Sequence, residues 1–153
     1  MKNLLIIPAL LIGFNASAAT KSVSLKCEEG VGNVSAPAQY LRIEGRINDT
    51  SKRGAFTEAE KSLLAVSVND GAKLVRLNNR EFKISVSNSV NGYLGSVQMR
   101  ISLLAEKSDV FGYTINFYED QPAESILKVI GSSWFTGKPK VIDSGLCWGR
   151  SPY

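Results

Sequence analysis

The sequence predicts an all-β fold: a single antiparallel domain of about eight strands that forms a closed barrel or a barrel-like sandwich. Three observations lead to this prediction. Apolar residues alternate with polar ones along most of the chain after residue 20, which is typical of strands with one buried face. Turn-forming residues separate these runs at intervals of about 8–15 residues. The only cysteines, Cys27 and Cys147, stand near the two ends of the domain.

The first residues predict a secretory signal peptide. Lys2 gives a positive start, residues 4–14 are mainly apolar, and Ala16-Ser17-Ala18 forms a small-x-small cleavage signal. We therefore expect a signal peptide over 1–18 and a single β domain over 19–153, with an uncleaved anchor as the alternative. The apolar stretch is shorter than the about 20 residues that span a bilayer, and Cys27 lies too far beyond it for lipid attachment.

The first half of the domain contains four predicted strands and one short helical turn. The run Leu41-Arg42-Ile43-Glu44 shows the alternation most clearly. Asn69-Asp70-Gly71 predicts a hairpin turn, because glycine tolerates the positive φ that a tight turn needs. Thr57 followed by Glu60 forms a capping box, which predicts the start of a short helix. The predicted strands are 22–27, 41–47, 62–68 and 74–77.

The second half contains the remaining predicted strands. Phe111, Tyr113, Ile115 and Phe117 form an aromatic stripe on one face, and Pro122 then interrupts the chain. The predicted strands are 82–87, 97–106, 111–117, 126–130 and 141–147. Residues on the apolar face of alternating runs should form the core, represented by Leu25, Ile43, Ile84, Ile101 and Ile115.

The two cysteines predict a disulfide bond. Export delivers a chain to an oxidising compartment, and two cysteines allow one intramolecular pairing, Cys27–Cys147. Two buried free thiols are the alternative. A bond requires Cα atoms within about 7 Å, so the first and last strands should be neighbours. A closed barrel explains this directly, and a sandwich can also accommodate it.

Composition excludes several functional classes. The chain has 18 basic and 14 acidic residues, a net charge of +4, and no histidine. This mild excess permits an anionic partner but lacks the concentrated basic stripe of a nucleic-acid binder. Without histidine, Ser-His-Asp and Cys-His catalysis are excluded. We expect no metal site and no cofactor, because zinc ligands, calcium loops and glycine-rich phosphate loops are missing.

Two remaining catalytic patterns are weak. Ser125 and Lys128 match the S-x-x-K motif of penicillin-binding enzymes, but residues three apart on a strand point to opposite faces. The acidic clusters Glu28-Glu29, Glu58/Glu60 and Glu119-Asp120 could supply a carboxylate pair for hydrolysis. Solvated charge is their simpler interpretation.

Two segments near the end of the chain, residues 132–140 and 147–153, combine tryptophan with basic residues, a composition typical of recognition surfaces. The alternative is that Trp134 and Trp148 plug a barrel end or pack over the disulfide. The leading hypothesis is an exported, periplasmic or extracellular, non-enzymatic binding or inhibitor-type protein with an envelope or protein partner. A carrier of an apolar ligand inside the barrel and a carboxylate-based hydrolase are alternatives. The candidate binding surface is Trp134, Phe135, Lys138, Lys140, Trp148 and Arg150.

Overall fold

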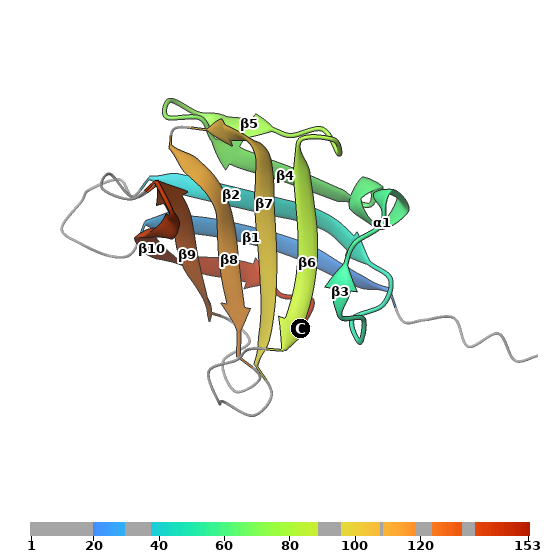
Figure 1. Cartoon of the computed structure of the whole chain (residues 1–153). Coiled ribbons are helices and arrows are strands. Elements are labelled where there is room, and N and C mark those ends of the chain that lie inside the picture. Colours follow the sequence, from blue (N-terminus) through green and yellow to red (C-terminus); the bar gives the residue numbers. More distant parts are fainter. Residues whose placement is uncertain (1–19, 30–37, 89–95, 108, 119–123, 133–136) are drawn as a thin grey trace, which may run out of the picture.

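The computed structural model describes residues 20–29, 38–88, 96–107, 109–118, 124–132 and 137–153. The expected signal peptide and the expected start at Ala19 lie outside these residues. The described chain forms ten strands and one short helix (Figure 1). These elements are β1 (Lys21–Glu29), β2 (Gln39–Ile47), β3 (Gly54–Ala55), α1 (Glu58–Ser62), β4 (Leu64–Asn69), β5 (Leu74–Arg76), β6 (Phe82–Asn88), β7 (Val97–Lys107), β8 (Val110–Phe117), β9 (Glu124–Ser132) and β10 (Pro139–Arg150).

The strands form one antiparallel sheet in the order β3-β6-β7-β8-β9-β10-β1-β2-β4-β5. The sheet curls into a half-barrel, in which β6 to β9 cross in front of β10, β1, β2 and β4 (Figure 1). The all-β prediction is confirmed, with ten strands instead of about eight. The predicted closure is not found: the edge strands β3 and β5 have no pairing with each other among the described residues.

The core lies between the two crossing halves of the sheet. All five residues predicted to be buried are there, because each occupies the inward face of an alternating strand. The main contributors from the front half are Phe82, Met99 and Tyr113, which face Leu41 and Val66 from the back half in one cluster. Burial of these apolar side chains stabilises the curled shape of the sheet. Each Å² of apolar surface removed from water contributes about 25 cal/mol to the free energy of folding.

Helix α1 lies where the curled sheet does not close. The predicted capping box is present: Thr57 Oγ1 accepts a hydrogen bond from Glu60 N, and Glu60 Oε2 accepts one from Thr57 N. Lys61, only 4% exposed, donates through Nζ to the carbonyl oxygens of Asn79 and Phe82 at 2.6 and 3.0 Å. The ammonium of Lys61 therefore connects α1, which leads into β4, with the start of β6, on the side where the sheet is not closed.

Register shifts interrupt the simple alternation in three places that matter for the site. Between β1 and β2 the shift falls at Cys27/Glu28, and between β10 and β9 it falls at Val141/Asp143. A third shift separates Val110 from Gly112. Val110 takes a core position there, and Phe111 is only partly buried. The predicted aromatic core stripe is therefore wrong at Phe111, since a bulge reverses which face a residue occupies.

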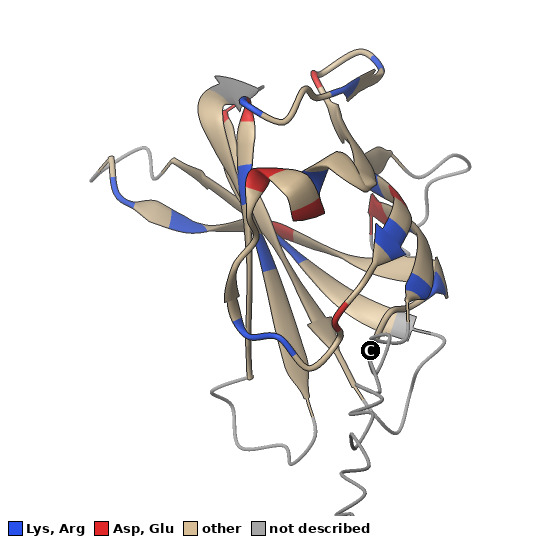
Figure 2. Ribbon diagram, turned by 90° about the vertical axis from the view of Figure 1, so that its right-hand side faces the viewer, with Lys and Arg blue, Asp and Glu red and all other residues tan. Residues whose placement is uncertain are grey.

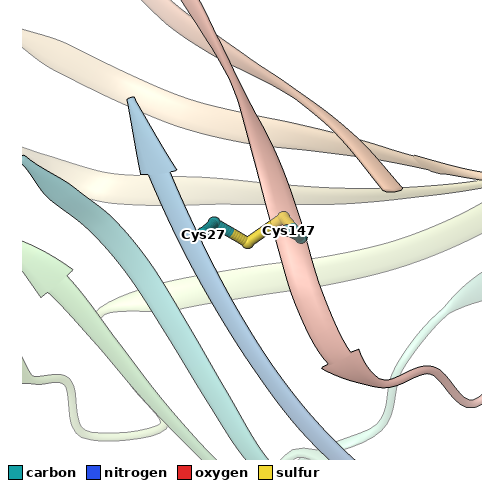
Figure 3. The surroundings of a disulfide bond; sticks show 2 residues. All are labelled: Cys27 and Cys147. Carbon is teal, nitrogen blue, oxygen red and sulfur yellow. A yellow bond between two sulfur atoms is a disulfide. The ribbon is translucent and has the colours of Figure 1, made fainter. Parts of the chain in front are cut away.

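The predicted disulfide joins β1 to β10 (Figure 3). Cys27 and Cys147 are direct cross-strand partners with Cα atoms 4.0 Å apart, and both are fully buried. Gly145 on β10 allows this close approach, because a side chain there would collide with the main-chain oxygen of Glu28. The first and last long strands are neighbours, as the sequence predicted.

Candidate functional site

The four described residues of the predicted binding surface do not form one patch. Trp134 and Phe135 lie outside the described residues. Lys138 and Lys140 are exposed near the start of β10, whereas Trp148 and Arg150 lie at its other end. The eight positions from Lys140 to Trp148 correspond to about 26 Å of extended strand. The prediction therefore combined two separate places on the molecule.

The β10 bulge also places these two groups on different faces. Lys140 is opposite Gly131, and after the shift at Val141/Asp143 the residue opposite Val129 is Asp143. The extra residue, Ile142, exchanges the inward and outward positions of the strand. As a result Asp143 shares the inner face with Val129, while Lys140 does not share a face with Trp148.

Trp148 lies on the outer face of the sheet. It neighbours Cys147 along a regular stretch of β10, so it points away from the buried disulfide. It is partly exposed, and its cross-strand partner on β1 is the exposed Lys26. Trp148 and the disulfide therefore lie on opposite faces of the sheet.

Other apolar residues extend this surface. Leu146 is two positions from Trp148 on the same face, and its partner on β9 is Ile126, which is 39% exposed. Arg150 is exposed at the far end, where its Nη1 donates to Ser22 Oγ at 2.8 Å. We call Lys26, Ile126, Leu146, Trp148 and Arg150 the outer patch. It consists of three apolar side chains on β9 and β10 and two cations, Lys26 on β1 and Arg150 on β10.

A second group of polar side chains lies on the inner face, near Glu29 at the end of β1. Tyr40 is the extra residue at the β1–β2 register shift, and its Oη donates a hydrogen bond to Asp143 Oδ2 on β10. Burial raises the pKa of Tyr40 above its usual range, and so do this hydrogen bond and the charges of Asp143 and Glu29. The phenol of Tyr113 adds a smaller effect of the same sign.

Tyr113 is the buried member of this inner group. It is 1% exposed, and its Oη has no hydrogen-bond partner among the described residues. Burial raises the pKa of Tyr113 to about 12, so the phenol is neutral at physiological pH. The sequence pattern assigned Tyr113 to the core and gave no indication of its link to Tyr40. That link depends on a bulge and on pairing between distant strands.

The other sequence candidates for catalysis have structural roles or are separated. Ser125 is buried on the inner face and Lys128 lies on the outer face, as expected for a strand. Glu58 and Glu60 pair with Lys61 and Lys52 around α1. Glu119 and Asp120 lie outside the described residues. Glu29 and Asp143, whose charges both act on Tyr40, were not paired by sequence reasoning because they are far apart along the chain.

Comparison with known proteins identifies no relative: no family model, no curated protein sequence and no solved structure matches the chain. Within the described ranges, no three or more acidic, cysteine or histidine side chains are grouped so as to hold a metal ion. No helix in the described part of the chain is long and apolar enough to cross a membrane. The site must therefore be interpreted from its own chemistry.

Proposed function

We propose that this chain is an exported, non-enzymatic binding domain that engages a partner protein through the outer patch. The observation that carries the proposal is Trp148, a partly exposed tryptophan on the same face of β10 as Leu146, whose cross-strand partner on β9 is the exposed Ile126. Tryptophan and arginine dominate the energetics of protein interfaces, especially where they surround a small apolar centre. A rigid sheet presents such side chains at little cost in conformational entropy.

The charges around the outer patch favour an acidic partner surface. Lys26 and Arg150 are exposed beside Trp148, while the nearby Arg42 and Glu44 neutralise each other in an ion pair of 2.6 Å. Two cations at the edge of an apolar centre would accelerate association with a negatively charged protein and would make binding sensitive to salt. An inhibitor of an envelope or extracellular enzyme fits this chemistry.

Two features support export. Residues 1–18 carry the three-part pattern of a signal peptide, and the Cys27–Cys147 bond needs an oxidising compartment to persist. The intact mass of protein recovered from the periplasm or medium tests this part of the proposal. It should correspond to a chain that begins at Ala19 without an acyl group, and retention of Met1 would contradict it.

The alternatives receive less support. A carrier needs an apolar cavity, but side chains such as Phe82, Met99 and Tyr113 occupy the space between the two halves of the sheet. Carboxylate-based hydrolysis remains a second candidate because Glu29 and Asp143 lie on the same inner face with Tyr40. Hydrolysis would require activity that disappears in Asp143→Asn, whereas partner binding through the outer patch should survive that substitution.

Site-directed photocrosslinking tests the partner proposal. A benzoylphenylalanine placed at Lys26, beside Trp148, should give a crosslinked protein in envelope extract. The same probe at Leu104, which is 55% exposed on β7, is the matched control and should not. Adding Trp148→Ala should abolish the adduct formed at position 26. Equal adducts from both positions, or an adduct at 26 that ignores Trp148→Ala, would refute the outer patch as the interface.

A further inference from the structure

A pocket of about 310 Å³ lies at the opposite end of β1 from the inner tyrosine group. It is formed where β1 and β7 begin and β8 ends, together with the β2–β3 connection and the last residues of the chain. Figure 2 shows basic and acidic residues interspersed around α1. The volume of the pocket is at the lower end of the range for small-molecule sites, about 300–1,000 Å³.

The walls of this pocket are mainly apolar and aromatic. Phe117 and Val97 belong to the buried core, and the ring of Tyr153 packs on Phe117 with centroids 5.2 Å apart at an interplanar angle of 56°. Burial raises the pKa of Tyr153 to about 12, so its phenol adds no negative charge at physiological pH. Such walls suit a flat apolar group, which would stack or pack edge-on against the two rings.

Arg53 lines the pocket, and several hydrogen bonds hold its guanidinium. Its Nε donates to Asn88 Oδ1 at 2.7 Å, and its Nη1 donates to the carbonyl oxygens of Thr50, Ser51 and Lys52 at 3.0 to 3.1 Å. The guanidinium lies 5.9 Å from the centre of the Tyr153 ring. Nη2 makes no hydrogen bond within the described residues. A guanidinium held in this way, with no partner for Nη2 in the described part of the chain, is preorganised to receive an anionic oxygen.

The remaining charge at the pocket also favours an anion. Lys21 lines it and has no ion pair within the described ranges. Within the described residues, the acid whose charge acts on Tyr153 is Asp49. Asp49 is already engaged by Ser51, whose Oγ and main-chain N donate to Asp49 Oδ1 at 2.6 and 2.9 Å. Among the described residues, the pocket lining therefore contains two cations, Lys21 and Arg53, and no acid.

We propose that this pocket binds a small organic anion with a flat apolar body and a carboxylate, with Arg53 and Lys21 holding the carboxylate. The apolar body would occupy the space beside Phe117 and Tyr153. The site is independent of the outer patch, since Trp148 and Lys26 do not line it. A binding domain with such a site would have a small-molecule ligand in addition to its partner protein.

The probe for this proposal is 2-naphthoate, whose fluorescence allows titration of the exported, oxidised protein. We expect saturable binding of one naphthoate per chain, with amide chemical-shift changes centred on Val97 and Phe117. The neutral 2-naphthalenemethanol and the cationic 2-naphthylmethylamine have nearly the same shape, and both should bind at least tenfold more weakly. Equal affinity for the three compounds, or no saturable binding of naphthoate, would overturn the proposal.

Two substitutions and one control identify the cations. Arg53→Gln should weaken naphthoate binding tenfold or more, because it removes a charge-assisted contact. Lys21→Gln should weaken binding about twofold to fivefold, and it disturbs no hydrogen bond that the structure shows, so it remains informative if Arg53→Gln fails to fold. Lys83→Gln, an exposed lysine on β6 that does not line the pocket, should leave binding unchanged. Unaltered affinity in a folded Lys21→Gln chain, or equal losses in all three variants, would overturn the assignment.

Discussion

The disulfide offers the sharpest test of the fold, through the double substitution Cys27→Ala/Cys147→Ala. The bond joins residues 120 positions apart. In the chain-entropy model, closing a loop of this length stabilises the folded state by about 5 kcal/mol. Residual structure in the unfolded chain reduces this value. Alanine is preferred to serine because both positions are fully buried and a hydroxyl would be left without a partner.

The contacts around the bond should survive its removal. β1 and β10 retain six paired positions, from Ser24↔Arg150 to Glu29↔Gly145, and each strand keeps its other neighbour. The double variant should therefore fold at low temperature with an unchanged β signal in far-ultraviolet circular dichroism. A loss of about 5 kcal/mol in a domain of this size should lower the melting temperature by about 10–20 °C.

Urea unfolding followed by circular dichroism provides the measurement. The oxidised wild type should have a higher midpoint and a smaller m-value than the double variant, because the crosslinked unfolded chain exposes less surface. Dithiothreitol should destabilise the wild type and leave the double variant unaffected, which is the internal control. Two reactive thiols per denatured, unreduced chain, or a stability change below about 1 kcal/mol, would refute the reasoning.

Three further outcomes follow from buried groups. Ile101→Ala should destabilise the domain by about 2–5 kcal/mol in urea unfolding, because Ile101 is fully buried; a change within error would mean that its face is misassigned. Lys61→Met should cost about 2–3 kcal/mol, since it leaves two carbonyl oxygens unpaired, whereas the exposed Lys83→Met should change stability little. Burial raises the pKa values of Tyr113 and Tyr153 to about 12, above the value near 10 expected in the unfolded chain. The folded state therefore keeps the full contribution of the two neutral phenols below pH 10 and loses it as the pH rises from 10 to 12. In a pH titration followed by absorbance at 295 nm, Tyr113→Phe should have one phenol fewer that ionises above pH 10. Its stability in urea unfolding at pH 7 should not be lower than that of the wild type. Ionisation of Tyr113 near pH 10 in the folded chain would contradict its burial.

The sequence contained enough information for the strands, the buried faces and the disulfide. Apolar and polar residues alternate along a strand because one face of the sheet is buried and the other is in water. The burial of residues such as Ile43 and Ile101 can therefore be predicted from their immediate neighbours in the sequence. The capping box of Thr57 and Glu60 is equally local. The Cys27–Cys147 bond was predictable although it is remote, because a chain with two cysteines has one pairing available.

Only the tertiary structure decided the candidate sites and the shape of the sheet. Tyr40 reaches Asp143, and Lys140 is separated from the face of Trp148, because bulges shift the register by one residue. A bulge leaves the local hydrophobic pattern almost unchanged but exchanges the two faces beyond it. Lys61 links α1 to the start of β6 through the main-chain oxygens of Asn79 and Phe82, which any residue type could present. Such contacts depend on how distant segments pack against one another, and no short stretch of sequence encodes that geometry.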